Sequence, residues 1–339
     1  MTIHQVNSLI SRGVFPDDAP GRKLIETHIS WVILCDKFVY KIKKPVHYSF
    51  LNFSTIEKRK HFCKREIELN KRLAENVYVD VQPVREKQDR FIIGGKQGSI
   101  IDYAVRMNKL DGELQMDKLL QKNKITKSHI IKLAEKIAQF HKGTAVIHKK
   151  KLMDLQKDFN DLGKEQEYLA NGLGSKYDEI ISFAMATSDS FIQQNRTLLE
   201  ARLNAGLFRD CHGDLHSRNI FLLPEPVPFD CIEFNDDFRR IDVLNEVAFL
   251  CMDLDAFGRH DLSDLFVDSY NCFFPTMMTR EDRNLFIFYK CYRANVRAKV
   301  NSLRARSSKN DTEKSKALAE AKKYLHLMDE YVKLPGVFY

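Results

Sequence analysis

The residues best suited to chemistry lie in residues 211–223 and, a little further on, residues 228–235. Asp214 sits in a polar turn, Asn219 follows five positions later, and Asp230 comes after a Pro-broken turn between two short apolar strands. A carboxylate beside a hydroxyl, with an amide oxygen and a second carboxylate as hard oxygen ligands, could serve a nucleotide and its Mg²⁺. Asp and Asn also form turns for structural reasons alone. Because a strand pattern supports each position, we interpret the first stretch as a catalytic loop and the second as a metal loop.

A lysine and a glutamate further upstream could complete such a site. The strand predicted at residues 38–43 alternates in direction, so Lys41 and Lys43 point to one face. A mid-strand lysine is a candidate phosphate anchor, whereas the alternative is that these lysines only protect an exposed edge strand. On the helix predicted at residues 54–75, Glu66 lies on an apolar stripe; it needs a cation if it turns inward and otherwise reaches water. We take Lys41 with Glu66 as the candidate pair, and Lys43 stays open as the alternative anchor.

The surrounding elements predict two lobes. Residues 1–107 predict a small antiparallel sheet with one helix, which starts at an S-T-I-E capping-box pattern. Residues 108–112 predict a hinge linker, and residues 113–339 a mainly helical lobe that carries the catalytic and metal loops. A short amphipathic helix and a Pro-rich turn at residues 15–20 come first. The predicted strands are residues 29–34, 38–43, 81–84, 90–93 and 99–107. The predicted helices of the second lobe are residues 113–122, 127–142, 151–170, 176–203, 241–254, 260–273, 280–305 and 313–331.

Composition limits the class of protein. With 339 residues, 44% of them hydrophobic, the chain is long enough for two lobes with a sizeable core. It has no apolar run of about 18 residues, no hydrophobic leader, and seven cysteines without a C-x-x-C pair. We therefore expect a cytoplasmic protein with reduced thiols and no membrane span. The net charge of +8 suits an anionic partner such as a nucleotide, but Lys and Arg are not interleaved with aromatic residues, so no specific nucleic acid is predicted.

The motifs resemble those of a known family. The H-G-D-L-H run at residues 212–216 with Asn219, followed by F-D-C-I at residues 229–232, resembles the H-G-D-L-H-x-x-N and I-D signatures of aminoglycoside phosphotransferases and the related choline and homoserine kinases. Residues 65–69 resemble the R-E-x-E-L helix of that family, and residues 133–141 resemble a later helix that ends in an apolar residue and His.

Three further stretches, residues 39–46, 229–235 and 248–254, resemble in particular an uncharacterised bacterial branch of this family. In that branch the kinase-like domain is sometimes fused to a P-loop domain. This sequence contains no G-x-x-x-x-G-K-[ST], so we expect no P-loop domain in it.

The resemblance implies an α+β, bilobal protein-kinase-like fold, ATP and Mg²⁺ as cofactors, and transfer of the γ-phosphate to a hydroxyl. Asp214 would be the base or the hydroxyl-orienting residue. Asn219 and Asp230 would hold Mg²⁺. Lys41, oriented by Glu66, would hold the α- and β-phosphates.

The chain also departs from the family pattern. No G-x-G-x-x-G loop precedes Lys41, and either Asp242 or Glu246 would take the place of a second aspartate beyond the metal loop. His212 would brace the catalytic loop or simply pack in the core. Glu233 is either a second metal ligand or a surface residue.

Three functions remain in competition. The first is an ATP-dependent kinase of a small molecule, with a neutral or anionic hydroxyl substrate favoured because Arg and Lys are frequent after residue 255. The second is a protein or lipid kinase of the same fold. The third is a non-catalytic nucleotide-binding scaffold, against which the joint presence of Asp214, Asn219 and Asp230 argues. The sequence leaves open the acceptor, the choice between ATP and GTP, and the oligomeric state.

Overall fold

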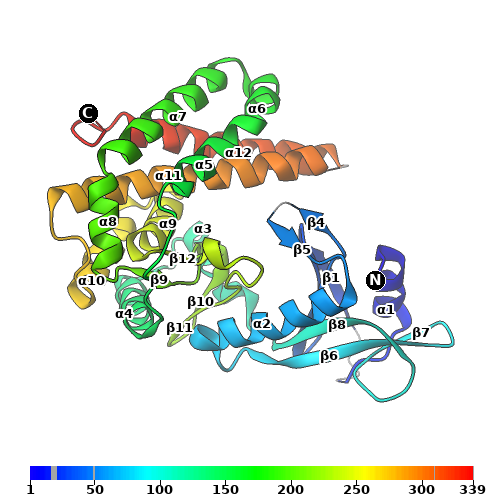
Figure 1. The fold of residues 1–339 in the computed structure, drawn as a ribbon. Coiled ribbons are helices and arrows are strands. Elements are labelled where there is room, and N and C mark those ends of the chain that lie inside the picture. Colours follow the sequence, from blue (N-terminus) through cyan, green and yellow to red (C-terminus); the bar gives the residue numbers. More distant parts are fainter. Residues whose placement is uncertain (17–20, 49, 309, 339) are drawn as a thin grey trace. The chain divides into compact units, whose positions relative to one another are not determined.

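The computed structural model describes residues 1–16, 21–48, 50–308 and 310–338 (Figure 1). Residues 17–20 of the predicted Pro-rich turn lie outside the described residues. The chain forms two compact units: unit 1 comprises Met1–Gln115 with Asn219–Phe238, and unit 2 comprises Met116–Arg218 with Arg239–Tyr339. The predicted metal loop thus folds with the N-terminal residues, whereas Asp214 belongs to unit 2. The hinge role of residues 108–112 stays a prediction.

Unit 1 is built on a six-stranded antiparallel sheet in the order β1-β2-β3-β8-β6-β7. Its strands are β1 (Lys23–Glu26), β2 (Ser30–Leu34), β3 (Phe38–Lys43), β6 (Tyr78–Lys87), β7 (Arg90–Ile93) and β8 (Ser99–Asn108). The five predicted strands are confirmed. The strand β1 was not predicted, because it is a four-residue edge strand with a charged residue at each end and gives little hydrophobic signal.

A helix covers each face of this sheet. The helix α1 (Ile3–Arg12) places Val6 and Leu9 in a core cluster with Trp31, Tyr40 and Ile42. The longer helix α2 (Ile56–Ala74) packs against β6 and β8 (Figure 1). Side chains alternate along β3, so those of Lys41 and Lys43 lie on the face opposite to Tyr40 and Ile42 and point toward α2.

The start of α2 differs by one residue from the S-T-I-E capping box. The N-cap is Thr55, whose Oγ1 accepts a hydrogen bond from the N–H of Lys58 at 3.3 Å. Ser54 is engaged elsewhere, because its hydroxyl donates to Asn52 Oδ1 at 2.7 Å. The prediction of a helix beginning here is confirmed, and the capping residue is corrected.

Two short hairpins and two single turns complete unit 1. The hairpin β4 (His47–Tyr48) with β5 (Leu51–Asn52) follows β3. The hairpin β10 (Ile220–Leu222) with β11 (Pro226–Pro228) is the one predicted between the catalytic and metal loops. The turns are η1 (Gly112–Leu114) and η4 (Asp236–Phe238), while along the chain η3 (Ser217–Asn219) contains the last residues of one segment of unit 2 and the first residue of a segment of unit 1.

Unit 2 is mainly helical, as predicted. Its helices are α3 (Met116–Gln121), α4 (Lys127–Gly143), α5 (Asp154–Asn160), η2 (Asp161–Glu165), α6 (Gln166–Leu173), α7 (Lys176–Gln194), α8 (Arg196–Asn204), α9 (Val243–Ala256), α10 (His260–Phe273), α11 (Arg280–Ser307) and α12 (Asp311–Val332). A two-stranded ribbon joins β9 (Phe208–Asp210) to β12 (Arg240–Asp242).

Two helices predicted as continuous are interrupted. The one at residues 151–170 is divided by the 3-10 turn η2, which contains Gly163, a poor helix former. The one at residues 176–203 breaks at Asn195, whose side chain donates to the carbonyl of Phe191 at 2.9 Å. Such local side-chain bonds compete with the helical pattern, which explains the break.

The centre of unit 2 is α9, which is buried at every position from Val243 to Asp255 and packs against α10 and α11. A helix buried on all sides must pair every charge that it carries. Its acidic residues are bonded accordingly, Glu246 to a loop backbone and Asp253 to Ser217. Across the described ranges, every helix is too short or too polar to span a lipid bilayer.

Candidate active site

Unit 1 holds Lys41 and Glu66 in direct contact. Lys41 projects from β3 toward α2, and its Nζ lies 2.9 Å from Glu66 Oε1. Glu66 is fully buried, so of the two orientations considered from the sequence the inward one is correct. Burial alone would raise the pKa of Glu66, but the ammonium groups of Lys41 and Lys43 lower it to about 2. The carboxylate therefore stays ionised at neutral pH.

Lys41 and Lys43, the two candidate anchors left open by the sequence, both face Glu66. Lys43 is fully buried, and its Nζ lies 2.6 Å from Glu66 Oε2 and also pairs with Glu233. Burial lowers the pKa of Lys41, but the carboxylates of Asp230 and Glu66 outweigh this effect and raise it well above its usual range. Only Lys41 retains some exposure, 12% of its side chain, so it is the lysine that can reach a ligand.

Asp230 adjoins the same lysine. Its Oδ1 lies 2.5 Å from Lys41 Nζ, and 40% of its side chain is exposed. Its backbone has a φ of 63°, in the left-handed region that residues other than Gly rarely adopt. The N–H of Asp230 donates to the hydroxyl of Tyr78 at 3.1 Å, which helps to hold this conformation. Backbone strain of this kind is concentrated at functional sites.

The hairpin between the two loops brings Asn219 near Asp230. The N–H of Phe229 donates to the carbonyl of Asn219 at 2.9 Å, so Asn219 lies across the hairpin from the residue before Asp230. The N–H of Cys231 donates to Asn70 Oδ1 at 2.8 Å, which ties the metal loop to α2.

Asn70 and Tyr78 position the metal loop, and neither was predicted from the sequence. Asn70 follows Glu66 by one helical turn, so the two side chains lie on the same face of α2. This spacing could have predicted that Asn70 points inward. Tyr78 begins β6, and nothing in its local sequence distinguishes it from a core tyrosine.

These residues suit a magnesium ion in type and charge. Asn219 and Asp230 supply the hard oxygen atoms that Mg²⁺ prefers. Glu233 is only 3% exposed and is paired with Lys43, so it is not the surface residue considered as one alternative. In this group two lysines face three carboxylates, those of Glu66, Asp230 and Glu233, which leaves one negative charge for a cation.

Asp214 lies in unit 2, in the loop after β9, with 37% of its side chain exposed. Its Oδ2 lies 3.4 Å from His216 Nε2, and its N–H donates to His212 Nδ1 at 3.3 Å. Burial raises the pKa of Asp214, but His216, Arg297 and His212 together hold it well below its usual range. Asp214 is therefore an anion throughout the neutral pH range.

The catalytic loop is braced from two helices of unit 2. Glu246 on α9 accepts from the backbone N–H of His212 at 2.9 Å and from that of Gly213 at 2.5 Å. Arg293 on α11 donates to the carbonyl of Gly213 at 3.3 Å. Of the two acidic residues left open by the sequence, Glu246 thus holds the loop, whereas Asp242 caps α9 and pairs with Arg202.

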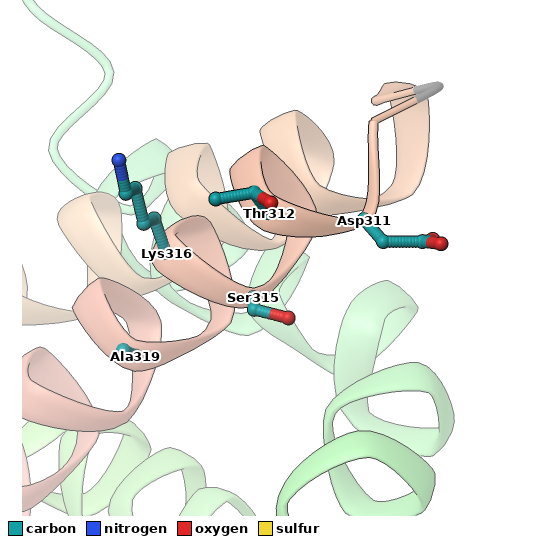
Figure 2. A pocket seen from close by; sticks show the side chains of 5 residues that line it. All are labelled: Asp311, Thr312, Ser315, Lys316 and Ala319. Carbon is teal, nitrogen blue, oxygen red and sulfur yellow. The ribbon is translucent and has the colours of Figure 1, made fainter.

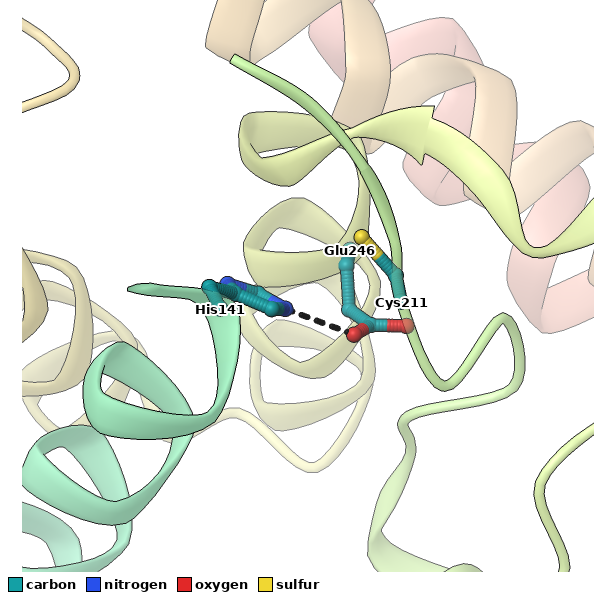
Figure 3. A group of neighbouring side chains, drawn as sticks. All are labelled: His141, Cys211 and Glu246. Atoms are coloured by element: carbon teal, nitrogen blue, oxygen red, sulfur yellow. Dashed lines mark hydrogen bonds and ion pairs between the residues drawn. The ribbon is translucent and has the colours of Figure 1, made fainter. Parts of the chain in front are cut away.

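His141, Cys211 and Glu246 lie together beneath this loop, with their potential ligand atoms within 4.8 Å of one another (Figure 3). Both ring nitrogens of His141 are already bonded: Nε2 lies 2.8 Å from Glu246 Oε2, and Nδ1 lies 2.8 Å from the hydroxyl of Tyr270. The group is fully buried. We conclude that it supports the loop through hydrogen bonds, which requires no metal.

A separate shallow hollow lies on the first turns of α12, lined by Asp311, Thr312, Ser315, Lys316 and Ala319 (Figure 2). It consists of exposed side chains from a single helix and includes none of the predicted site residues.

Similar structures define the class of fold. A choline/ethanolamine kinase family protein from Mesorhizobium loti aligns over 98% of this chain and 100% of its own, with a TM-score of 0.53 and 11% identity. The GDP complex of aminoglycoside 2'-phosphotransferase-IIIa aligns over 96% and 98%, with a TM-score of 0.55 and 15% identity. An ethanolamine kinase from Plasmodium vivax aligns over 94% and 83%, with a TM-score of 0.50 and 13% identity. The chain therefore has the protein-kinase-like fold, and the predicted fold class is confirmed.

Sequence comparison adds relatives but no family name. No family model matches the chain. An uncharacterized protein from Mycobacterium tuberculosis (strain H37Rv) is 28% identical over 321 residues, which cover 93% of this chain and 60% of that protein. An uncharacterized protein from Mycobacterium bovis gives the same values. The chain thus spans 60% of the length of the curated relatives that it matches.

Proposed function

We propose that this chain is an ATP-dependent phosphotransferase that moves the γ-phosphate to a hydroxyl of a small molecule. The observation that carries the proposal is the bonded group of Lys41, Glu66 and Asp230 in unit 1, on a protein-kinase-like fold. It combines a partly exposed cation, a buried carboxylate that orients it, and an exposed carboxylate on strained backbone.

Each residue has a defined role in this proposal. Lys41 binds the α- and β-phosphates, and Glu66 keeps its ammonium charged and in place. Asn219 and Asp230 hold Mg²⁺, which when bound neutralises phosphate charge. Phosphoryl transfer depends mainly on such positioning and electrostatic stabilisation, since little covalent chemistry is left to the protein.

Asp214 acts on the acceptor. Because its pKa is depressed, it is a weak base and does not remove the hydroxyl proton before the reaction begins. It accepts a hydrogen bond from the hydroxyl and directs the oxygen toward the phosphorus. It takes the proton only as the new P–O bond makes that proton acidic.

A small-molecule acceptor is favoured over a protein or lipid. The structural neighbours are described as choline, ethanolamine and aminoglycoside kinases, and one was solved as a kanamycin complex. Arg293 and Arg297 on α11 stand beside the Asp214 loop. Since cations repel a polycationic acceptor, we propose a neutral or anionic hydroxyl compound such as a sugar or alcohol.

The test is a screen of hydroxyl compounds for nucleotide consumption, with peptides and lipids in separate arms. ATP and GTP are run in parallel, because two neighbours were solved with GDP. Asp214→Asn should lower turnover about a hundredfold or more. The matched control is Asp268→Asn, an exposed residue of α10, which should leave turnover unchanged. Unchanged turnover in Asp214→Asn protein that binds Mg²⁺-ATP would refute the mechanism, and binding without any turnover would favour the non-catalytic scaffold.

A further inference from the structure

The second lysine of β3, Lys43, has no direct role in the proposed reaction, although it is among the most deeply buried charged side chains described. None of its side chain is exposed. Its ammonium contacts Glu66 and Glu233, and it also lies 4.9 Å from the centre of the Phe53 ring. A cation enclosed in this way cannot reach a nucleotide.

Lys43 and Lys41 divide the carboxylate of Glu66 between them. Lys41 takes Oε1 at 2.9 Å, and Lys43 takes Oε2 at 2.6 Å. With both oxygens engaged, the carboxylate plane is fixed. If Lys43 were removed, Glu66 could turn so that both oxygens face Lys41, and Lys41 would then be drawn toward α2 and away from Asp230.

Lys43 also reaches the metal loop. Its pairing with Glu233 is a further attachment of that loop within unit 1, in addition to the bond from Asp230 to Tyr78 and the bond from Cys231 to Asn70. These attachments at loop positions 230, 231 and 233 hold the strained Asp230 and the residues that follow it.

Stability alone does not account for this arrangement. Well-packed apolar side chains stabilise a protein interior as well as a buried ion pair does, because each buried ion pays a large desolvation cost. A buried ion pair instead fixes the orientation of its side chains, because the charged groups form their hydrogen bonds in one geometry only.

We propose that Lys43 and Glu233 form a positioning pair that sets Glu66 and the metal loop, and through them Lys41 and Asp230, for nucleotide binding. This inference rests on the proposed function. Lys43 is a positioning residue and not a catalytic one, because it acts on the nucleotide only through Glu66 and Glu233.

The test separates positioning from simple charge balance by combining Lys43→Met with Glu233→Gln. The single change Lys43→Met leaves Glu233 buried without its cation, so it should lower the urea midpoint of unfolding. The double variant removes both charges and should restore that midpoint. If the pair positions the site, the double variant should remain weak in nucleotide binding even though its stability is restored. We expect its dissociation constant for a non-hydrolysable ATP analogue with Mg²⁺ to be about tenfold higher than that of wild type. A lost hydrogen bond to a charged group costs about 1.5 kcal/mol or more, which corresponds to about tenfold in affinity.

The matched control is Lys44→Met, one residue along. Lys44 pairs with Glu26 at 2.6 Å and makes no described contact with Glu66. This variant should bind the analogue as wild type does. In any variant that turns over, the KM for nucleotide should rise about as much as the dissociation constant, while kcat changes by less than about threefold, since uniform binding is lost.

The outcomes are distinct. Wild-type affinity in the double variant would overturn the inference and leave Lys43 and Glu233 as a charge-balanced structural pair. If the double variant fails to fold, Glu233→Gln alone decides, because it keeps Lys43 on Glu66; unchanged affinity there would overturn the role of the metal loop. Wild-type protein that binds the analogue but transfers no phosphate would refute the proposed function, while the affinities of the variants would still test the pair. Wild-type protein that does not bind the analogue would overturn both.

Discussion

Replacing Glu246 tests how the catalytic loop is held. This carboxylate accepts three hydrogen bonds, from the N–H groups of His212 and Gly213 and from His141. Glu246→Gln preserves the shape of the side chain. The amide oxygen can keep the bonds from His212 and His141, but the amide NH₂ then faces the N–H of Gly213, and a buried donor is left without an acceptor.

The lost bond gives the size of the effect. Losing a hydrogen bond to a charged group costs about 1.5–3 kcal/mol. The pKa of Glu246, which burial raises and the bond from His141 lowers, is about 2 against an ordinary value of 4.5. The folded loop therefore favours the charged carboxylate over a neutral group, which gives the sign of the change. We expect Glu246→Gln to lower the free energy of unfolding by about 1.5–3 kcal/mol.

The depressed pKa of Glu246 also predicts how its contribution to stability changes with pH. Because the folded pKa is depressed, the contribution of Glu246 is complete above about pH 4.5 and is lost as the pH falls toward 2. The stability difference between wild type and Glu246→Gln should therefore be largest at neutral pH and shrink across that window. Other acidic groups titrate in both proteins and cancel in the difference.

The assay is urea unfolding followed by two probes. Helical circular dichroism reports mainly unit 2, while fluorescence of Trp31, the single tryptophan, reports unit 1. The matched control is Glu179→Gln, at an exposed position of α7, which should change little. A loss below about 0.5 kcal/mol for Glu246→Gln, within the range of ordinary surface changes, would refute the reasoning. So would a difference from wild type that stays constant from pH 5 to pH 2.

Three further changes have expected outcomes. Asn70→Ala leaves the N–H of Cys231 without its acceptor and should lower the stability of unit 1 by about 1–3 kcal/mol, measured by the fluorescence of its tryptophan during urea unfolding. Arg202→Met strips the cation from two carboxylates and should cost about 3–5 kcal/mol in the helical transition. At pH 8 a thiol reagent should label the exposed Cys272 of the native protein rapidly, whereas Cys291, whose pKa burial raises well above its usual range, should react only after unfolding.

The controls for these changes are exposed residues of the same types. Asn171→Ala and Arg196→Met should each alter stability by less than about 1 kcal/mol; the second breaks only a surface pair with Glu200. Equal losses in the buried and exposed variants would contradict the assigned bonds. Labelling of several thiols at one rate in native protein would contradict the burial of the cysteines.

Much of the sheet and of the helical unit was predictable because local patterns decide them. The alternation in β3 placed Lys41 and Lys43 on one face, and the apolar stripe of α2 made an inward orientation one of the two alternatives for Glu66. These patterns reflect burial along one element, and burial is what a sequence shows most directly.

The positioning residues were not predictable in the same way. Lys43 was considered only as an alternative to Lys41, because a sequence does not show that one carboxylate can serve two lysines. Glu233 was left between a ligand and a surface residue, since its burial depends on a strand 190 positions away. Nothing near Tyr78 in the sequence indicates that its hydroxyl accepts a hydrogen bond from the metal loop, which is distant in the sequence.

The composition of unit 1 has a consequence for synthesis in the cell. Lys43 is buried against Glu233, yet they lie 190 positions apart, and the first segment of unit 2, Met116–Arg218, is synthesised in between. At about 5–20 residues per second, a ribosome needs roughly 10–40 s to cover that distance. During that interval the nascent sheet carries a lysine whose second counter-charge has not yet been made. The N-terminal unit therefore cannot mature as an independent early domain, and its last structural step must wait for a segment from the second half of the message.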